Sequence, residues 1–356
     1  MTRLMRNSSF EFLKIIAIVC IVFCHSIPAE RIEYHYATTD YWLFGVMIFR
    51  QLGSVGNAIF MVSSTWFLVD SDNTNLRKMK NMIADNQIIS LIFLVLLWEY
   101  YSIDLKLAIK QVFPFLFSTM WYVTCYVMYY CLHGIINKAL QNINLVPRLV
   151  MLCLFILNGY YFVLGGLYFS DLVGFIIAHV FTYYLKIQLR GASIAKVKKY
   201  GYLLLLIGIL GWLLGAVILN YAGIHSDFIG HKFHQWNRFF NPFILILAYG
   251  SVLIASTIEV YSMIINKLSG TSLFVYMITG NQLLRIFPDN ALYDLICSEF
   301  GTSMDVCFLF VLIYAIAKYV LGTGLAIVYQ KTLGKVTQYI TIKECDMIEN
   351  AMRRIK

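Results

Sequence analysis

The chain has 356 residues, of which 60% are hydrophobic and 13% are charged, and its mean hydropathy is +0.71. This balance excludes a soluble globular enzyme, because such domains carry about 25% charged residues. The net charge of +9 does not indicate nucleic acid binding, because the basic residues cluster between apolar runs, where they orient helices and meet anionic lipid headgroups. We expect a single membrane domain over residues 1–356, with a short basic tail from about residue 331.

Apolar stretches long enough to cross a bilayer recur along the chain. A spanning helix needs about 20 mostly apolar residues, because lipid offers no hydrogen-bonding partner to a bare peptide group. The first stretch follows a basic start, as a signal peptide does, but no small-residue cleavage site precedes Glu30 and Arg31, so we expect a retained helix. We predict an all-α polytopic bundle with spans near residues 10–27, 54–70, 86–102, 121–139, 148–166, 171–187, 201–220, 239–257, 271–287 and 305–328.

The basic segments between these spans predict the orientation. In a ten-span count they all fall on one side: the N-terminus, Arg77 to Lys80, Lys138 to Arg148, Lys186 to Lys199, Lys267 and the tail from Lys331. By the positive-inside rule this side is cytoplasmic, so we expect both termini in the cytoplasm. Aromatic residues at the span ends are interpreted as interfacial anchors: Trp42, Trp98, Tyr100, Trp121 and Trp236.

His25 ends the first predicted span, at a depth where a titratable side chain is expensive unless it is used. Imidazole is also well suited to accept and return a proton near neutral pH. Lys14 lies eleven positions earlier, so the two side chains share one helical face, about 16 Å apart along the axis. A groove on that face could hold an anion near Lys14 and its reactive end near His25, with Glu11 able to pair with Lys14. Alternatively, Glu11 and Lys14 lie in the headgroup layer and His25 is an interfacial or hydrogen-bonded helix-end residue.

Lys318 lies near the middle of the last predicted span, where a charge costs at least about 2.5 kcal/mol on insertion scales. We therefore expect Lys318 to face the bundle interior and to have a partner there, which the sequence does not identify.

A metal site is not predicted. The eight cysteines lie mostly in apolar runs and form no C-x-x-C pair, so neither a zinc site nor a disulfide framework is indicated. The loops expected outside carry His35, His225, His231 and His234, of which the last three have loose metal-like spacing. No cysteine or paired carboxylate completes a known pattern, so a solvated loop is the better interpretation.

Four segments, in order, resemble the acyltransferase 3 family of membrane proteins. The stretch from Asn7 to His25 is similar to the family's opening, which has an acidic residue, a basic residue and then a histidine. The other segments are Asn57 to Leu68, similar to a second-span pattern ending in Ser-Gly-Tyr-Phe-Leu, then Trp121 to Tyr130, and Ser272 to Ile278. One such segment alone would be weak, but four spread over nearly the whole chain are a specific match.

The resemblance implies ten helices in a bacterial inner membrane and an acyltransferase whose donor is cytoplasmic acyl-CoA, usually acetyl-CoA, with no permanently bound cofactor. The acceptor would be a hydroxyl of a cell-surface polysaccharide or its lipid-linked precursor, and His25 would be the catalytic histidine. Cationic side chains can bind the phosphates of coenzyme A through charge-assisted hydrogen bonds. The candidates for donor binding are Lys14, Arg77, Lys78 and Lys80, which alternatively only determine the topology. The matching segments also supply candidate substrate contacts: Glu11, Asn57, Trp121, Tyr122, Tyr126, Asn281 and Arg285.

Two departures from the family pattern stand out. Many members carry an Arg-x-x-Arg pair entering the third span, whereas residues 81–87 here contain no arginine. Related sequences often place a histidine after the ninth-span Val-Tyr-Leu-Ile run, whereas this chain has Thr279, Gly280 and Asn281. These departures leave two alternatives open: a transporter of glycans or lipid-linked intermediates, and a catalytically degenerate partner in a polysaccharide assembly complex.

Overall fold

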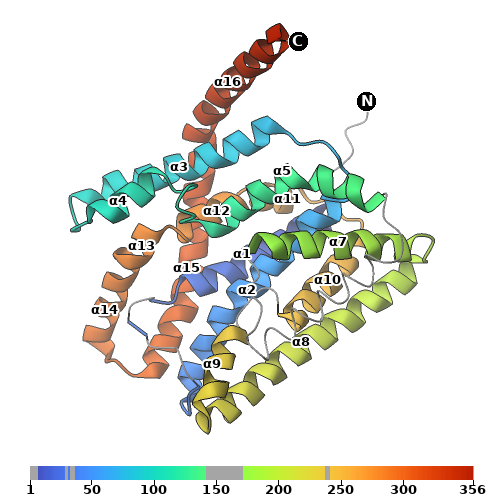
Figure 1. The fold of residues 1–356 in the computed structure, drawn as a ribbon. Coiled ribbons are helices and arrows are strands. Elements are labelled where there is room, and N and C mark those ends of the chain that lie inside the picture. Colours follow the sequence, from blue (N-terminus) through green and yellow to red (C-terminus); the bar gives the residue numbers. More distant parts are fainter. Residues whose placement is uncertain (1–6, 29–30, 33–36, 142–170, 237–240, 356) are drawn as a thin grey trace.

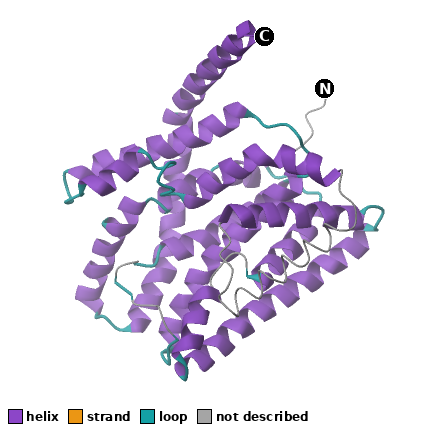
Figure 2. Ribbon diagram, viewed as in Figure 1, coloured by secondary structure: helices purple, strands orange, loops and turns teal. Residues whose placement is uncertain are grey.

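The structure is a computed structural model that describes residues 7–28, 31–32, 37–141, 171–236 and 241–355. It is all-helical, with 82% helix and no strand among these residues (Figure 2). Six of the described helices are long and apolar enough, by length and composition, to cross a membrane. They are α1 (Ser8–His25), α2 (Tyr41–Leu68), α3 (Leu76–Trp98), α7 (Asp171–Leu189), α8 (Ile194–Ile224) and α15 (Met304–Lys331).

The remaining described helices are shorter or more polar. Among them, α16 extends beyond the rest of the bundle and carries the C-terminus (Figure 1). The set comprises α4 (Leu105–Val112), α5 (Trp121–Gln141), α9 (Asp227–Trp236), α10 (Pro242–Ser256), α11 (Met263–Ser269), α12 (Ser272–Thr279), α13 (Gln282–Ile286), α14 (Pro288–Phe300) and α16 (Leu333–Ile355).

The all-α class is confirmed, whereas the ten spans are not. The six apolar helices correspond to the first, second, third, sixth, seventh and tenth predicted spans. Helix α5 occupies the fourth but falls outside the six, and α10, at the eighth, has 15 residues. The predicted span at 148–166 lies outside the described residues, as do Arg3, Arg6 and His35 and the side chains of His231 and His234.

Several helices begin well before their apolar cores. Helix α2 begins at Tyr41 rather than near residue 54, because the Asp40 side chain accepts hydrogen bonds from amides of the first turn. Helix α3 begins at Leu76, where Asn75 plays the same role. Apolar periodicity marks the part of a helix that packs, and the polar caps mark its ends.

The predicted ninth span is wrong as a single helix. Residues 271–287 form two short helices, α12 and α13, interrupted at Gly280 and Asn281. The Asn281 side chain accepts a hydrogen bond from the Leu283 amide at 3.0 Å and so caps α13. Because of this break, the chain can change direction between α12 and α13, which a single straight helix could not do.

Contacts between helix ends agree with the predicted grouping of loops. The ends expected on the basic side touch one another through the Ser8 amide and Val260 carbonyl at 2.7 Å, Lys186 and Asp70 at 2.5 Å, and Arg77 and Asp346 at 2.6 Å. At the opposite ends, Arg31 pairs with Asp294 at 2.7 Å. Each of these contacts joins segments that the sequence placed in the same group.

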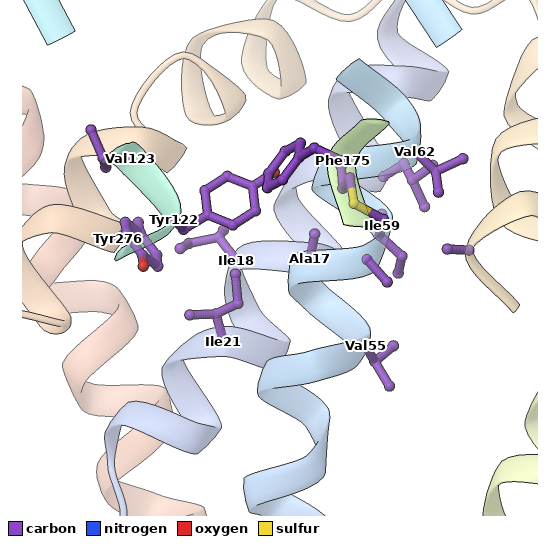
Figure 3. Close-up of a cluster of buried hydrophobic side chains, with 14 of the residues drawn as sticks. Ala17, Ile18, Ile21, Val55, Ile59, Val62, Tyr122, Val123, Phe175 and Tyr276 are labelled. Carbon is purple, nitrogen blue, oxygen red and sulfur yellow. The ribbon is translucent and has the colours of Figure 1, made fainter. Parts of the chain in front are cut away.

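Helices α1 and α2 pack closely at the centre of the bundle. A Cβ atom at Gly56 would lie 2.3 Å from the Ala17 carbonyl oxygen, so only glycine permits this approach. Figure 3 shows Ile18 and Ile21 of α1 beside Tyr122 and Tyr276, which places the core next to the end of α1.

One predicted interfacial anchor is wrong. Trp236 is 8% exposed, and its indole nitrogen donates to the Trp212 carbonyl at 3.0 Å. Its ring lies against Gly215, where a Cβ would come within 2.2 Å of it. The indole is therefore a packing residue, whereas Trp98 and Tyr100 are exposed at the end of α3, as anchoring requires.

Candidate active site

His25 is the last residue of α1, and its ring faces the end of α12. Its Nδ1 atom lies 3.3 Å from the Thr279 hydroxyl oxygen, and its ring centroid is 5.6 Å from that of Tyr276. A Cβ at Gly280 would approach the His25 Cε1 atom to 2.7 Å, so the glycine leaves room for the ring. The imidazole is thus held inside the protein, partly buried, at the point where the ninth predicted span breaks.

Lys318 has the interior partner that its depth predicts. Its ammonium forms a buried ion pair with Asp289 and donates a hydrogen bond to the His25 carbonyl at 2.9 Å. The Tyr314 hydroxyl donates to the other Asp289 oxygen at 2.6 Å. The two charges are compensated in the bundle interior, and the C-terminal carbonyl of α1 is satisfied by a cation.

Arg285 and Asn281 also lie near the histidine. The charge of Arg285 acts electrostatically on His25 and Lys318. The Arg285 Nε atom is buried and has no hydrogen-bond partner among the described residues. The buried Asn281 amide donates to the Gln111 side chain at 3.3 Å while its oxygen caps α13. Arg285 therefore retains a donor in this region, whereas Asn281 is engaged in structure.

A row of tyrosines leads away from His25. Successive ring centroids lie 5.9 Å apart from Tyr276 to Tyr122, 6.5 Å from Tyr122 to Tyr126 and 6.1 Å from Tyr126 to Tyr130. The Lys78 ammonium lies 4.9 Å from the Tyr130 ring centroid, where a cation is attracted to the ring face. The row therefore connects the histidine to a predicted donor-binding cation. Trp121 packs edge-on against Tyr122.

A surface pocket of about 420 Å³ lies at the far end of this row. Arg77, Lys78 and Asp85 contribute charged groups to it, and the first turn of α12 forms part of its wall. Asp85 belongs to the stretch that lacks the family's arginine pair, and its carboxylate accepts a hydrogen bond from the Tyr329 hydroxyl at 2.8 Å. The pocket is basic at its rim and acidic deeper inside.

Two of the predicted donor-binding cations are already paired. Arg77 contacts Asp346 at 2.6 Å and Lys80 contacts Glu344 at 3.2 Å, and all four side chains are well exposed. Both acids belong to α16, so the last helix lies across the basic end of α3. An anionic ligand would compete with these carboxylates.

The remaining predicted residues are distributed around α1 and α2. Lys14 pairs with Glu11 at 3.1 Å, as predicted for this spacing, and Glu11 also accepts a hydrogen bond from Ser269. The Asn57 side-chain oxygen is buried without a hydrogen-bond partner among the described residues. Lys14 is thus tied to the basic end of α1, and the structure does not bring it to His25.

Sequence reasoning missed Asp289, Tyr314 and the role of Thr279. A signal existed for two of them, because an intramembrane lysine requires a carboxylate and Tyr314 lies one helical turn before Lys318. The contact of Thr279 with His25 spans 254 residues, and no local pattern encodes it.

The predicted site is therefore assembled in part. Residues from the beginning and end of the chain meet at His25, and the basic pocket lies at the other end of α12. His25 is not among the residues that line this basic pocket. No family model, curated protein or solved structure matched this chain.

Proposed function

We propose that this chain is a membrane O-acyltransferase of the acyltransferase 3 type that moves an acetyl group from acetyl-CoA to a glycan hydroxyl. The observation that carries the proposal is the connection of His25, through Tyr276, Tyr122 and Tyr126, to the cation Lys78. The resembling segments include His25 and the three tyrosines, whereas Lys78 lies outside them.

The distances suit a donor that enters from the basic pocket. Leu273, in the pocket wall, and Thr279, at His25, are six residues apart in α12, about 9 Å along the helix. The pantetheine arm of coenzyme A is longer than this. Its phosphates would lie at Arg77 and Lys78, and the thioester would reach toward His25.

In the proposed reaction, His25 removes the proton from the acceptor hydroxyl. The acceptor oxygen then forms a bond to the thioester carbonyl carbon, the C–S bond breaks, and the coenzyme A thiolate leaves and takes up the proton. Arg285, with an unpartnered Nε atom, would anchor the acceptor. Lys318 and Asp289 hold the backbone of His25 and do not react.

The test is transfer of labelled acetyl groups from acetyl-CoA to glycan by the purified protein in lipid nanodiscs. We expect His25→Gln to lose transfer while the protein still folds. His179→Gln is the matched control, because His179 is also buried and hydrogen-bonded, but its partners are Tyr129 at 2.6 Å and Asn137 at 2.7 Å, neither of which contacts His25. Its activity per folded molecule should persist.

Other outcomes would overturn the proposal. Retained transfer in His25→Gln would remove the histidine from the mechanism. Glycan translocation without transfer of label would identify a transporter. A deletion that alters the surface polysaccharide, combined with a His25→Gln strain that does not, would identify a structural partner.

A further inference from the structure

We infer that Thr279 is a positioning residue that fixes the tautomer of His25, with the proton on Nδ1 and the lone pair on Nε2. The inference rests on the proposed function for its catalytic meaning but not for its geometry. It assigns a role to the residue at which this chain departs from the family pattern.

The argument starts from the hydroxyl of Thr279. It has one proton, and it donates that proton to the Val275 carbonyl at 2.8 Å, one turn earlier in α12. The second neighbour of the hydroxyl oxygen is the His25 Nδ1 atom at 3.3 Å. Because the proton is committed to the shorter bond, the oxygen can only accept from the imidazole.

The tautomer follows from this assignment. A neutral imidazole has one N–H group, and the hydrogen bond of one nitrogen decides which nitrogen carries it. With the proton on Nδ1, Nε2 holds the lone pair. No group in the described part of the chain forms a hydrogen bond to Nε2, so that lone pair is free for a substrate proton.

Residues around His25 and Thr279 hold the imidazole in the orientation that allows this hydrogen bond. Lys318 binds the His25 carbonyl, which fixes the backbone, and Gly280 leaves space for the Cε1 edge of the ring. Thr279 itself is 1% exposed, so water does not compete for its oxygen. The orientation of the base is therefore built from α1, α12 and α15 together.

The direct test is nitrogen-15 NMR of the histidine side chains in full-length protein in nanodiscs, at alkaline pH where the rings are neutral. The His25 signals are assigned by their loss in His25→Gln. We expect the Nδ1-protonated pattern in the wild type and in Thr279→Ser, which keeps the hydroxyl. Thr279→Val should shift His25 toward the Nε2-protonated form that free imidazole side chains prefer.

The kinetic test uses the same variants. Thr279→Val should lower kcat about tenfold, the effect of one lost hydrogen bond, with an unchanged KM for acetyl-CoA, and Thr279→Ser should restore kcat. Thr323→Val is the matched control, because Thr323 makes the same type of bond, to the Tyr319 carbonyl at 2.8 Å. Gel filtration identifies any variant that does not fold.

The two failures are distinguishable. Wild-type His25 protonated on Nε2, or a Thr279→Val protein with unchanged His25 signals, overturns the inference whether or not the protein transfers acyl groups. Absence of acyl transfer by the wild type, with His25 protonated on Nδ1, overturns the proposed function and leaves the positioning role of Thr279 standing.

Discussion

At the scale of single residues, a buried ion pair joins Lys318 of α15 to Asp289 of α14, and the same lysine donates a hydrogen bond to the last residue of α1. The Lys318 and Asp289 side chains are 5% and 1% exposed, so water cannot solvate either charge if its partner is removed. A buried pair of this kind contributes little net stability, but the loss of one member is expensive.

We predict that Lys318→Met destabilises the protein by about 3–5 kcal/mol, because it leaves the Asp289 carboxylate uncompensated. The double variant Lys318→Met with Asp289→Leu should recover most of that loss. Thermal unfolding of both variants in nanodiscs measures the difference. Equal destabilisation in the single and double variants would contradict this account.

At the scale of elements, the contact between α1 and α2 places the histidine. Glycines at positions 53 and 56 face Cys24 and Ala17, so the two helix backbones lie close together just before His25. A small-residue spacing in an apolar helix was the available signal for this contact. Its partner helix could not be predicted, because apolar patterns do not specify which faces meet.

We predict that Gly56→Ala separates α1 from α2 and lowers stability by about 1–3 kcal/mol, because the new methyl group meets a backbone carbonyl that cannot move aside. Gly324→Ala in α15 is the control. No atom lies within 4 Å of its Cβ position, and the better helix propensity of alanine should make it neutral or slightly stabilising. Thermal unfolding distinguishes the two, and a neutral Gly56→Ala would contradict the packing argument.

Helix α14 is joined to the segment after α1 by an exposed ion pair. The hydrogen bond from Arg31 lowers the pKa of Asp294, so the contribution of the pair is present at neutral pH and is lost as the pH falls through that lowered pKa. We predict that wild type exceeds Arg31→Gln in stability by at most about 1 kcal/mol at neutral pH. The difference should vanish in strong acid, and unfolding measured as a function of pH checks it.

At the scale of the whole molecule, the sequence predicted the helical class and the six long apolar helices of the described residues, whereas the count of ten spans is not confirmed. It did not predict the break at Gly280 and Asn281, because both halves are apolar and only the cap of α13 marks the interruption. For the site, the depth of Lys318 in an apolar run correctly predicted that it is buried and has a partner. Asp289 and Thr279 depend on contacts between distant segments, which a local pattern does not contain.

We predict that both ends of the chain face the cytoplasm. A fluorescent protein that folds only in the cytoplasm should be active when fused after Lys356, and a periplasmic phosphatase at the same position should be inactive. The phosphatase fused within the loop near Asp294 should be active, because that loop belongs to the opposite group. The reverse pattern would contradict the topology.

Helix α16 covers the basic end of α3 through exposed ion pairs, which are weak individually and sensitive to salt. We predict that Glu344→Gln with Asp346→Asn lowers the KM for acetyl-CoA by up to about fivefold, because the two carboxylates no longer compete with the donor phosphates for Arg77 and Lys80. Steady-state kinetics at low and high salt checks this. An unchanged KM would separate these cations from donor binding.

The distance along the chain between the parts of the site has a consequence for biosynthesis. Asp289 and Lys318 are 29 residues apart and leave the ribosome nearly together, so their charges can neutralise each other soon after synthesis. His25 is synthesised 293 residues before Lys318, so the hydrogen bond between them can form only after α15 has been made. A nascent chain released before α15 would therefore lack the hydrogen bond that holds the His25 carbonyl.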